Sequence, residues 1–192
     1  MPAPMLSIFA RWPQPGAVKT RLIPHFGAQG AAAIYTRLLV HTVAVARASG
    51  VPFALRVTGG DPARFRAAFG ADLAVEPQGP GDLTARLSSV PPPALVIGSD
   101  CPGLSPQILR DAAGALDQAA AVIGPASDGG YYLLGYNDDA AFAFADMPWS
   151  TPAVFGETVR RFAARGIAPV VLPELADVDE PADLDRWPEF LP

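Results

Sequence analysis

The sequence has very few of the residues from which disulfides and soft metal sites are built. Its 192 residues include one cysteine, Cys101, and two histidines, His25 and His41. A single cysteine excludes a disulfide within the chain and a multi-cysteine zinc site. Two histidines leave little room for a histidine metal cluster or a catalytic triad. No histidine lies near Cys101 in the sequence, so we interpret it as a small buried thiol and not as a nucleophile.

Long apolar runs are also missing. No stretch approaches the roughly 20 apolar residues that a membrane-spanning helix requires. The apolar run over residues 5–10 ends at Arg11, which is too early for a signal peptide. We therefore expect a cytoplasmic protein with no membrane partner. Half of the residues are apolar, which excludes a disordered chain, and the length suits one domain over residues 1–192.

The N-terminal third lacks acidic residues altogether. No Asp or Glu precedes Asp61, so residues 1–60 carry six cations and no acid, although the net charge of the chain is −5. A cationic segment in an acidic protein predicts a local anion site. The basic residues form no long stripe, so nucleic acid is not an expected partner. Lys19 is the only lysine in the chain, which hints that a lysine is required there.

Short apolar runs alternate with helical patterns along the chain. These patterns predict strands over residues 5–10, 53–57, 73–75, 94–97, 120–123, 131–136 and 169–172. They predict helices over residues 29–49, 62–69 and 82–88, with further helices that open at Ser105-Pro106 and at Thr151-Pro152.

Continuously apolar strands are typical of a mostly parallel sheet with helices on both faces. Only a few residues separate the strands at 120–123 and 131–136, too few for a parallel crossover, so this pair is expected to be antiparallel. No composition break or internal repeat divides the chain. The expected fold is therefore a single α/β domain with a mixed, mostly parallel sheet.

In sheets of this kind, ligands bind beyond the carboxyl ends of the strands. The loop after the first predicted strand carries Arg11, Lys19 and Arg21 with no acid nearby, and Gly16 allows its backbone to approach a ligand. This combination favours a polyphosphate site. The loop is not a P-loop, because Val18 precedes the lysine, and a dinucleotide fingerprint is absent. A basic surface loop without a ligand is the alternative. On this loop, replacement of Lys19 is expected to leave the melting temperature unchanged.

Three later segments place acids near the same edge. Asp100 follows the strand at 94–97, where its carboxylate either holds a hard cation such as Mg²⁺ or Mn²⁺ or caps a turn. The segment from Ser127 to Tyr132 combines Asp128 with two glycines, and an ordinary turn between strands is its simplest interpretation. The acids of residues 177–184 fit either the same site or the first turn of a final helix.

Six segments together resemble a known family. They are FARWPQPGAVKTRL (9–22), QGPGDLTARL (78–87), IGSDCPGL (97–104), GPASDGGYYLLG (124–135), PWSTP (148–152) and DVDEPADL (177–184). The chain is similar to the bacterial glycosyltransferase-like family DUF2064 of the nucleotide-diphospho-sugar transferase superfamily, some of whose members are named in connection with arsenosugar biosynthesis. This resemblance implies a GT-A-like, Rossmann-like fold and a transferase activity.

The superfamily also contains nucleotidyltransferases, and their pattern implies roles for residues of this chain. A basic loop after the first strand holds phosphates, which matches Arg11, Lys19 and Arg21, with Gly16 in the same loop. A metal-binding acid at a strand end matches Asp100, and a second acid near the C-terminus matches Asp179. The resemblance thus implies a bound Mg²⁺ or Mn²⁺, with Lys19 and Asp100 central to catalysis.

Two further segments match the pattern less directly. The resemblance implies nucleotide contacts from Gln78, Gly79 and Arg86. It implies a sugar or acceptor pocket shaped by Asp128, Gly129, Gly130 and Tyr131. The chain departs from the pattern at Gly98, where many GT-A glycosyltransferases have the first acid of Asp-x-Asp, and at Thr84, where a glycine is expected.

The resulting expectation is a metal-dependent glycosyltransferase that uses a nucleoside diphospho-sugar and a small-molecule acceptor. A nucleotidyltransferase, which joins a nucleoside triphosphate to a phosphorylated small molecule and releases pyrophosphate, is the alternative enzyme. A non-catalytic nucleotide-binding protein on the same fold is the alternative outside enzymes. No motif specifies the base, the sugar, the acceptor or an oligomeric state.

Overall fold

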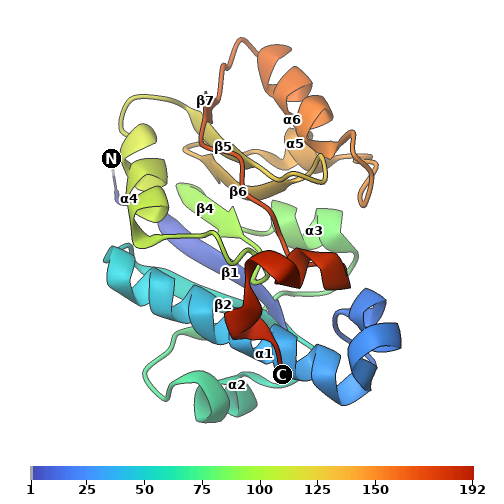
Figure 1. Ribbon diagram of the computed structural model, residues 1–192. Coiled ribbons are helices and arrows are strands. Elements are labelled where there is room, and N and C mark those ends of the chain that lie inside the picture. The colour runs from blue at the N-terminus through green and yellow to red at the C-terminus, as the bar shows by residue number, and fades with distance from the viewer. Residues whose placement is uncertain (1) are drawn as a thin grey trace.

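The computed structural model describes residues 2–192 of the chain. Within these residues, seven strands form one sheet in the order β3-β2-β1-β4-β6-β5-β7 (Figure 1). The strands are β1 (Met5–Arg11), β2 (Phe53–Thr58), β3 (Val75–Pro77), β4 (Ala94–Ile97), β5 (Ala121–Pro125), β6 (Tyr131–Tyr136) and β7 (Val170–Val171). Strand β6 is antiparallel to both of its neighbours and the other pairs are parallel. The predicted mixed, mostly parallel sheet is confirmed.

Helices cover both faces of this sheet, as predicted. The helices are α1 (Ile23–Ser49), α2 (Pro62–Phe69), α3 (Leu83–Ser88), α4 (Pro106–Ala115), α5 (Ala141–Phe144) and α6 (Val154–Ala163), with 3₁₀ turns η1 (Thr20–Leu22), η2 (Pro181–Arg186) and η3 (Pro188–Phe190). Alternate strand residues divide between two cores. Leu6 and Ile8 pack with α1 and α4 in one core, and Val96 and Leu134 pack with α3, α5 and α6 in the other.

Most of the predicted element boundaries hold within a few residues. Asp61 and Ser105 cap α2 and α4 by accepting backbone N–H hydrogen bonds, as their positions before a proline predict. Strand β3 lies two residues later than expected, because its register is set by pairing of Val75 with Leu55 of β2. Helix α6 begins at Val154, also two residues late, and the short α5 was not predicted.

The C-terminal segment packs against the N-terminal part of the chain. Leu184 and Phe190 join Leu22, Ile34 and other residues of η1 and α1 in a third cluster, and Figure 1 shows this red segment beside α1. The packing brings the acids of the C-terminal loop to the edge where β1 and β4 end. None of the helices within residues 2–192 is both long and apolar enough to cross a membrane.

Candidate functional site

Lys19 holds an uncommon position in the loop between β1 and α1. It caps η1 with φ 44° and ψ 49°, a left-handed conformation that a residue other than glycine seldom adopts. Val18 and Leu22 are buried on either side of it and fix the loop to α1. The side chain of Lys19 is only 7% exposed. The loop therefore presents its lysine to the interior of the site and not to bulk water.

The ammonium group of Lys19 contacts carboxylates from two distant segments. Its Nζ atom donates to Asp100 Oδ2 at 2.8 Å and to Asp179 Oδ1 at 3.0 Å. Arg21 Nη1 donates to the other carboxylate oxygen, Asp179 Oδ2, at 2.8 Å. Burial alone would lower the pKa of Lys19, but the charges and hydrogen bonds of Asp100 and Asp179 raise it above its usual value. Lys19 is thus firmly held as a cation.

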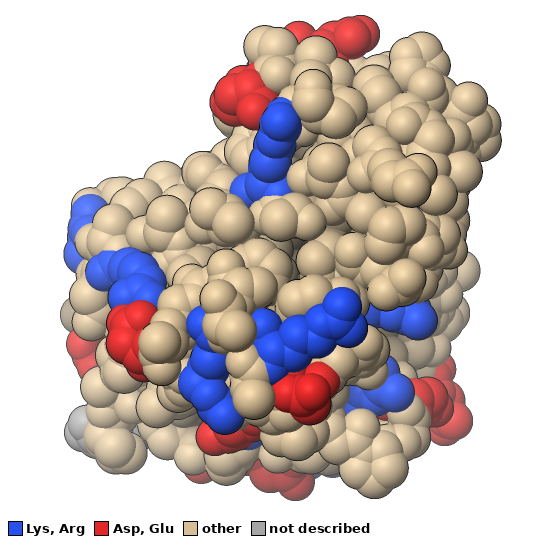
Figure 2. All heavy atoms as spheres, turned by 90° about the horizontal axis from the view of Figure 1, so that it is seen from below, with Lys and Arg blue, Asp and Glu red and all other residues tan. Residues whose placement is uncertain are grey.

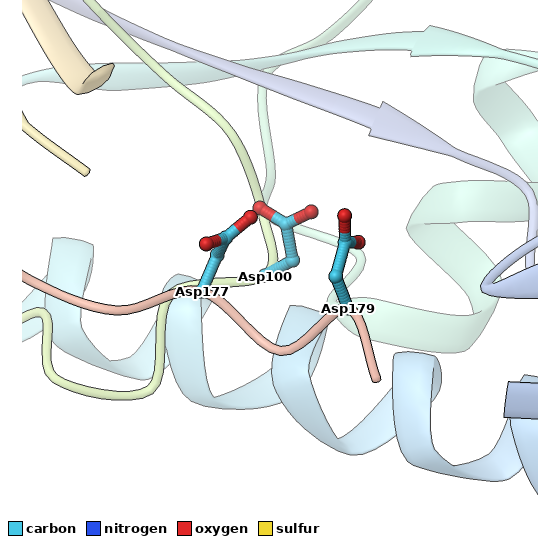
Figure 3. Close-up of side chains that lie close together, drawn as sticks. All are labelled: Asp100, Asp177 and Asp179. Atoms are coloured by element: carbon cyan, nitrogen blue, oxygen red, sulfur yellow. The ribbon is translucent and has the colours of Figure 1, made fainter. Parts of the chain in front are cut away.

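Asp177 adds a third carboxylate, for which no individual metal role was predicted from the sequence. Carboxylate oxygens of Asp100, Asp177 and Asp179 lie within 4.8 Å of one another, and Figure 3 shows the three groups side by side. We name these residues the acid cluster. A backbone hydrogen bond from Val178 N to Asp100 O, 3.0 Å long, joins the two segments. The signal for Asp177 was its place in the same motif as Asp179, two residues away.

The acid cluster has the donor set and spacing of a hard-cation site. Burial, followed by the charges of Asp100 and Asp128, raises the pKa of Asp177 to about 6, because each added carboxylate disfavours another negative charge. Three carboxylates at this spacing can share one divalent cation through oxygen, which Mg²⁺ and Mn²⁺ prefer. Burial, followed by the charges of Asp100 and Asp177, raises the pKa of Cys101 to about 12, so its thiol stays protonated.

A polar pocket of about 340 Å³ lies over the loop after β1. Its charged lining residues are Arg11, Lys19, Arg21, Asp100 and Asp179, which are the cations predicted for the loop after β1 and the two acids predicted for the metal. We call it the basic pocket. Figure 2, a view from below, shows separate basic side chains across the middle of the molecule, with acidic side chains among and below them. Two forked guanidinium groups and an ammonium can neutralise an anion with several oxygen atoms.

Tyr35 of α1 is a buried residue in the lining of this pocket. Its hydroxyl accepts a hydrogen bond from Arg11 N at 2.9 Å and lies 2.9 Å from Ser99 Oγ in a second hydrogen bond. These contacts tie α1 to the ends of β1 and β4. Only helical periodicity marks Tyr35 in the sequence, since its hydrogen-bond partners lie 24 and 64 residues away.

A second pocket has a volume of about 250 Å³, and no member of the acid cluster lines it. Most of its lining is apolar, and we call it the apolar pocket; its residues are Phe9, Leu83, Leu87, Val96, Ile97, Gly98, Asp128, Gly130, Tyr131, Tyr132, Trp149, Ser150, Thr151 and Val154. A smaller pocket of about 100 Å³ adjoins both, because it shares Asp100 with the basic pocket and Asp128 and Tyr131 with the apolar pocket. The acid cluster thus lies between a cationic and an apolar subsite.

The structure does not bring every predicted residue into these pockets. The Gln78 amide donates to Ala10 O and to Arg56 O, both at 3.0 Å, and accepts from Arg86 Nη1 at 3.3 Å. Gln78 is buried and its amide nitrogen is occupied by these backbone contacts. Like Arg86, it lines none of the three pockets described above.

The predicted glycines play different parts. Gly16 and Gly79 have φ values of +83° and +85° with open space around them, and neither lines one of the three pockets. Gly129 has φ +88°, and a Cβ atom there would overlap the backbone of Pro152. It therefore allows the segment after Trp149 to pack closely on the turn that carries Asp128. Gly130 lines both the apolar pocket and the smaller one.

Comparisons with known proteins agree with this architecture. The profile of the bacterial family DUF2064, described as an uncharacterized protein conserved in bacteria, matches residues 41–151, more than half of the chain. A crystal structure from Desulfovibrio desulfuricans G20, of a protein proposed to be a nucleotide-diphospho-sugar transferase, is 28% identical with a TM-score of 0.85. The match covers 94% of this chain and 84% of that chain. The search of curated proteins gave no match.

Two less similar structures share the fold. A nucleotidyl transferase from Methanothermobacter is 17% identical, with a TM-score of 0.61 and coverage of 99% and 98% of the two chains. Glucosyl-3-phosphoglycerate synthase from Mycobacterium tuberculosis, in complex with Mg²⁺ and uridine diphosphate, is 13% identical, with a TM-score of 0.50 and coverage of 95% and 74%. The GT-A-like fold predicted from the resemblance is confirmed. Because proteins with different reactions share it, the fold alone does not select one.

Proposed function

The chain belongs to the bacterial family DUF2064, and from this premise we propose that it is a divalent-metal-dependent glycosyltransferase that uses a nucleoside diphospho-sugar. The observation that carries the proposal is the position of Lys19, which lines the basic pocket and contacts two members of the acid cluster. A pocket for phosphate oxygens and a set of carboxylates for a cation therefore share a boundary. A cation–diphosphate complex requires this arrangement.

The basic pocket would hold the diphosphate of the donor. Arg11 and Arg21 present guanidinium groups to its oxygens, and Lys19 exchanges its carboxylate contacts for a phosphate contact. Transfer of the sugar breaks the bond between its anomeric carbon and the diphosphate, which leaves with both electrons. Charge therefore grows on the diphosphate during the reaction, and cations positioned in advance stabilise it most in the transition state.

The acid cluster would hold the cation. The oxygens of Asp100, Asp177 and Asp179 suit Mg²⁺ or Mn²⁺ in number and spacing. Such an ion supplies positive charge to the departing diphosphate when bound. The ammonium of Lys19 contacts two of these carboxylates. Its movement from the carboxylates to a phosphate would free their oxygens for the cation, which would couple cation binding to nucleotide binding.

The acceptor would bind on the side of Asp128, Gly129, Gly130 and Tyr131. Its oxygen forms the new bond to the anomeric carbon, and its proton passes to a carboxylate at the junction of the pockets. Asp128 lines both the apolar pocket and the smaller pocket that contains Asp100 and Asp177. Asp128 is therefore the carboxylate that would lie next to both an acceptor in the apolar pocket and the metal site.

One observation favours a nucleotidyltransferase as the second candidate. Residue 98 is glycine, and a Cβ atom there would lie 2.9 Å from Asp100 Oδ1, so the first acid of an Asp-x-Asp pair would force Asp100 to move. A single strand-end acid is closer to the nucleotidyltransferase pattern. In that reaction, a phosphorylated substrate attacks the α-phosphorus of a nucleoside triphosphate, and the same cations stabilise the departing pyrophosphate.

A thermal-shift panel tests the proposal. The protein is heated with nucleoside mono-, di- and triphosphates and with nucleotide sugars, each with Mn²⁺ and with EDTA. At a ligand concentration of about 100 Kd, binding adds about 2.7 kcal/mol to stability, or roughly 5–11 °C for a chain of this length. We expect such shifts for diphosphate compounds with Mn²⁺ and much smaller ones with EDTA. Asp100→Asn should abolish the Mn²⁺ effect, and a panel without any nucleotide shift would refute the proposal.

A further inference from the structure

Few polar side chains line the apolar pocket. Its walls come from β1, β4, α3, the start of β6 and the segment from Trp149 to Val154. Leu87, Val96 and Val154 are buried, and Leu83 stands at the rim with 41% of its surface exposed. A dry cavity of about 150 Å³ with aliphatic and aromatic walls is known to hold benzene. The apolar pocket, at about 250 Å³, has room for a larger body.

We propose that this pocket binds the acceptor through an apolar body about the size of two fused rings, with one polar group directed to Asp128. The identity of this ligand as the acceptor rests on the proposed function, whereas its apolar character is inferred from the pocket itself. Burial of apolar surface contributes about 25 cal/mol per Å², so walls of this kind select ligands by their apolar area.

The polar groups around the pocket are too few for a sugar ring. Among its lining residues, the oxygen-bearing side chains besides the tyrosines are Asp128, Ser150 and Thr151. The Thr151 hydroxyl already donates to Pro148 O at 2.7 Å, and one oxygen of Asp128 accepts from Gly130 N at 2.8 Å. The Tyr131 hydroxyl is buried from solvent. A sugar would find few protein partners here, and each of its hydroxyls that became buried without a partner would cost about 1–3 kcal/mol.

Thr84 acts as a positioning residue for one wall of the pocket. The Trp149 indole donates from Nε1 to Thr84 Oγ1 at 2.9 Å, and Thr84 Oγ1 donates to Phe144 O at 3.3 Å. The Trp149 ring also stacks on Phe144 with centroids 6.5 Å apart. A buried indole N–H requires such a partner. The glycine expected at position 84 could not supply one, so this departure from the family pattern has a structural consequence in the apolar pocket.

The site can be tested with N-phenyl-1-naphthylamine, a neutral dye that becomes fluorescent in apolar surroundings. We expect one dye per chain, displaced by apolar aromatic alcohols and not by glucose or by a nucleoside diphosphate. Leu83→Asp should weaken dye binding at least tenfold, and an acid suits this position in the first turn of α3. Leu191→Asp is the matched control, because Leu191 is similarly exposed, at 38%, and lines a different groove. It should leave dye binding unchanged.

The role of Thr84 is tested with the same dye. Thr84→Val keeps the shape of the side chain and removes the acceptor for Trp149, so dye affinity should fall about fivefold, and Thr84→Ser should restore it. Nucleotide shifts with Mn²⁺ should stay the same in both variants. Equal dye binding by Leu83→Asp and the unmodified protein, or displacement of the dye by glucose or by nucleotide alone, would overturn the inference. Failure of the nucleotide panel would instead overturn the proposed function, and the dye would still decide the chemistry of the pocket.

Discussion

Replacement of Lys19 by methionine removes the ammonium that contacts Asp100 and Asp179. Loss of one partner of a fully buried ion pair costs about 3–5 kcal/mol, whereas an exposed pair contributes about 0–1 kcal/mol. The Lys19 side chain is 7% exposed, but its partners are 36% and 40% exposed. We therefore expect a loss of about 1–2 kcal/mol, between these limits. For a chain of this length, that loss corresponds to a melting temperature lower by roughly 2–8 °C. This prediction replaces the expectation of an unchanged melting temperature, which rests on the loop position alone, because the Lys19 side chain is buried.

Thermal denaturation in EDTA, followed by titration with Mn²⁺, measures this effect. Mn²⁺ should stabilise Lys19→Met more than the unmodified protein, because the ammonium no longer competes for the same carboxylate oxygens. Arg21→Met is the matched control: the Arg21 side chain is 64% exposed and its guanidinium contacts Asp179 alone, so the melting temperature should change little. The reasoning fails if Lys19→Met and the unmodified protein melt together and respond equally to Mn²⁺.

Two further substitutions test the acid cluster and the turn beside it. The pKa of Asp177 is about 6 in the folded protein, against an ordinary value of 3.8. Between these two pH values the folded protein therefore retains a proton that the unfolded chain releases. The stability that comes from this proton is fully present below pH 4 and is lost as pH rises through 6. In EDTA, urea midpoints of Asp177→Asn should therefore fall less between pH 4 and 6.5 than those of the unmodified protein, and parallel pH curves would contradict the assignment. Gly129→Ala should lower the free energy of unfolding by at least about 2 kcal/mol, because of left-handed backbone strain and overlap with Pro152. Gly16→Ala introduces the same strain but points into open space, so it should lower the free energy of unfolding by about 1 kcal/mol. Equal urea midpoints for the two alanine variants would show that the close packing on Pro152 is absent.

The sequence predicts the edge of the sheet at which the site lies, for a physical reason. Continuously apolar strands indicate a parallel sheet, and in such a sheet the loops after β1 and β4 must leave at the same edge. The meeting of Lys19 with Asp100, 81 residues apart, follows from that rule. The position of the C-terminal acids does not follow from it, because it depends on packing of Leu184 and Phe190 against α1.

The apolar pocket could not be predicted from sequence patterns. It forms where α3 meets the segment after α5, and the hydrogen bond between Thr84 and Trp149 joins residues 65 positions apart. Neither Thr84 nor Trp149 belongs to a periodic pattern from which this contact could be predicted. The same holds for Gln78, which the resemblance assigns to the nucleotide. Its amide nitrogen is directed to Ala10 and Arg56 by strand register, which motif spacing alone does not contain.

Product release is the most direct test of the proposed glycosyl transfer. The protein is incubated with Mn²⁺ and a series of nucleotide sugars, and in parallel with nucleoside triphosphates and phosphorylated metabolites. We expect release of a nucleoside diphosphate from at least one nucleotide sugar, and a rate about 10²- to 10³-fold lower for Asp100→Asn, as for loss of one charge-stabilising group. Release of pyrophosphate in the second series, with no diphosphate in the first, would contradict glycosyl transfer and identify a nucleotidyltransferase.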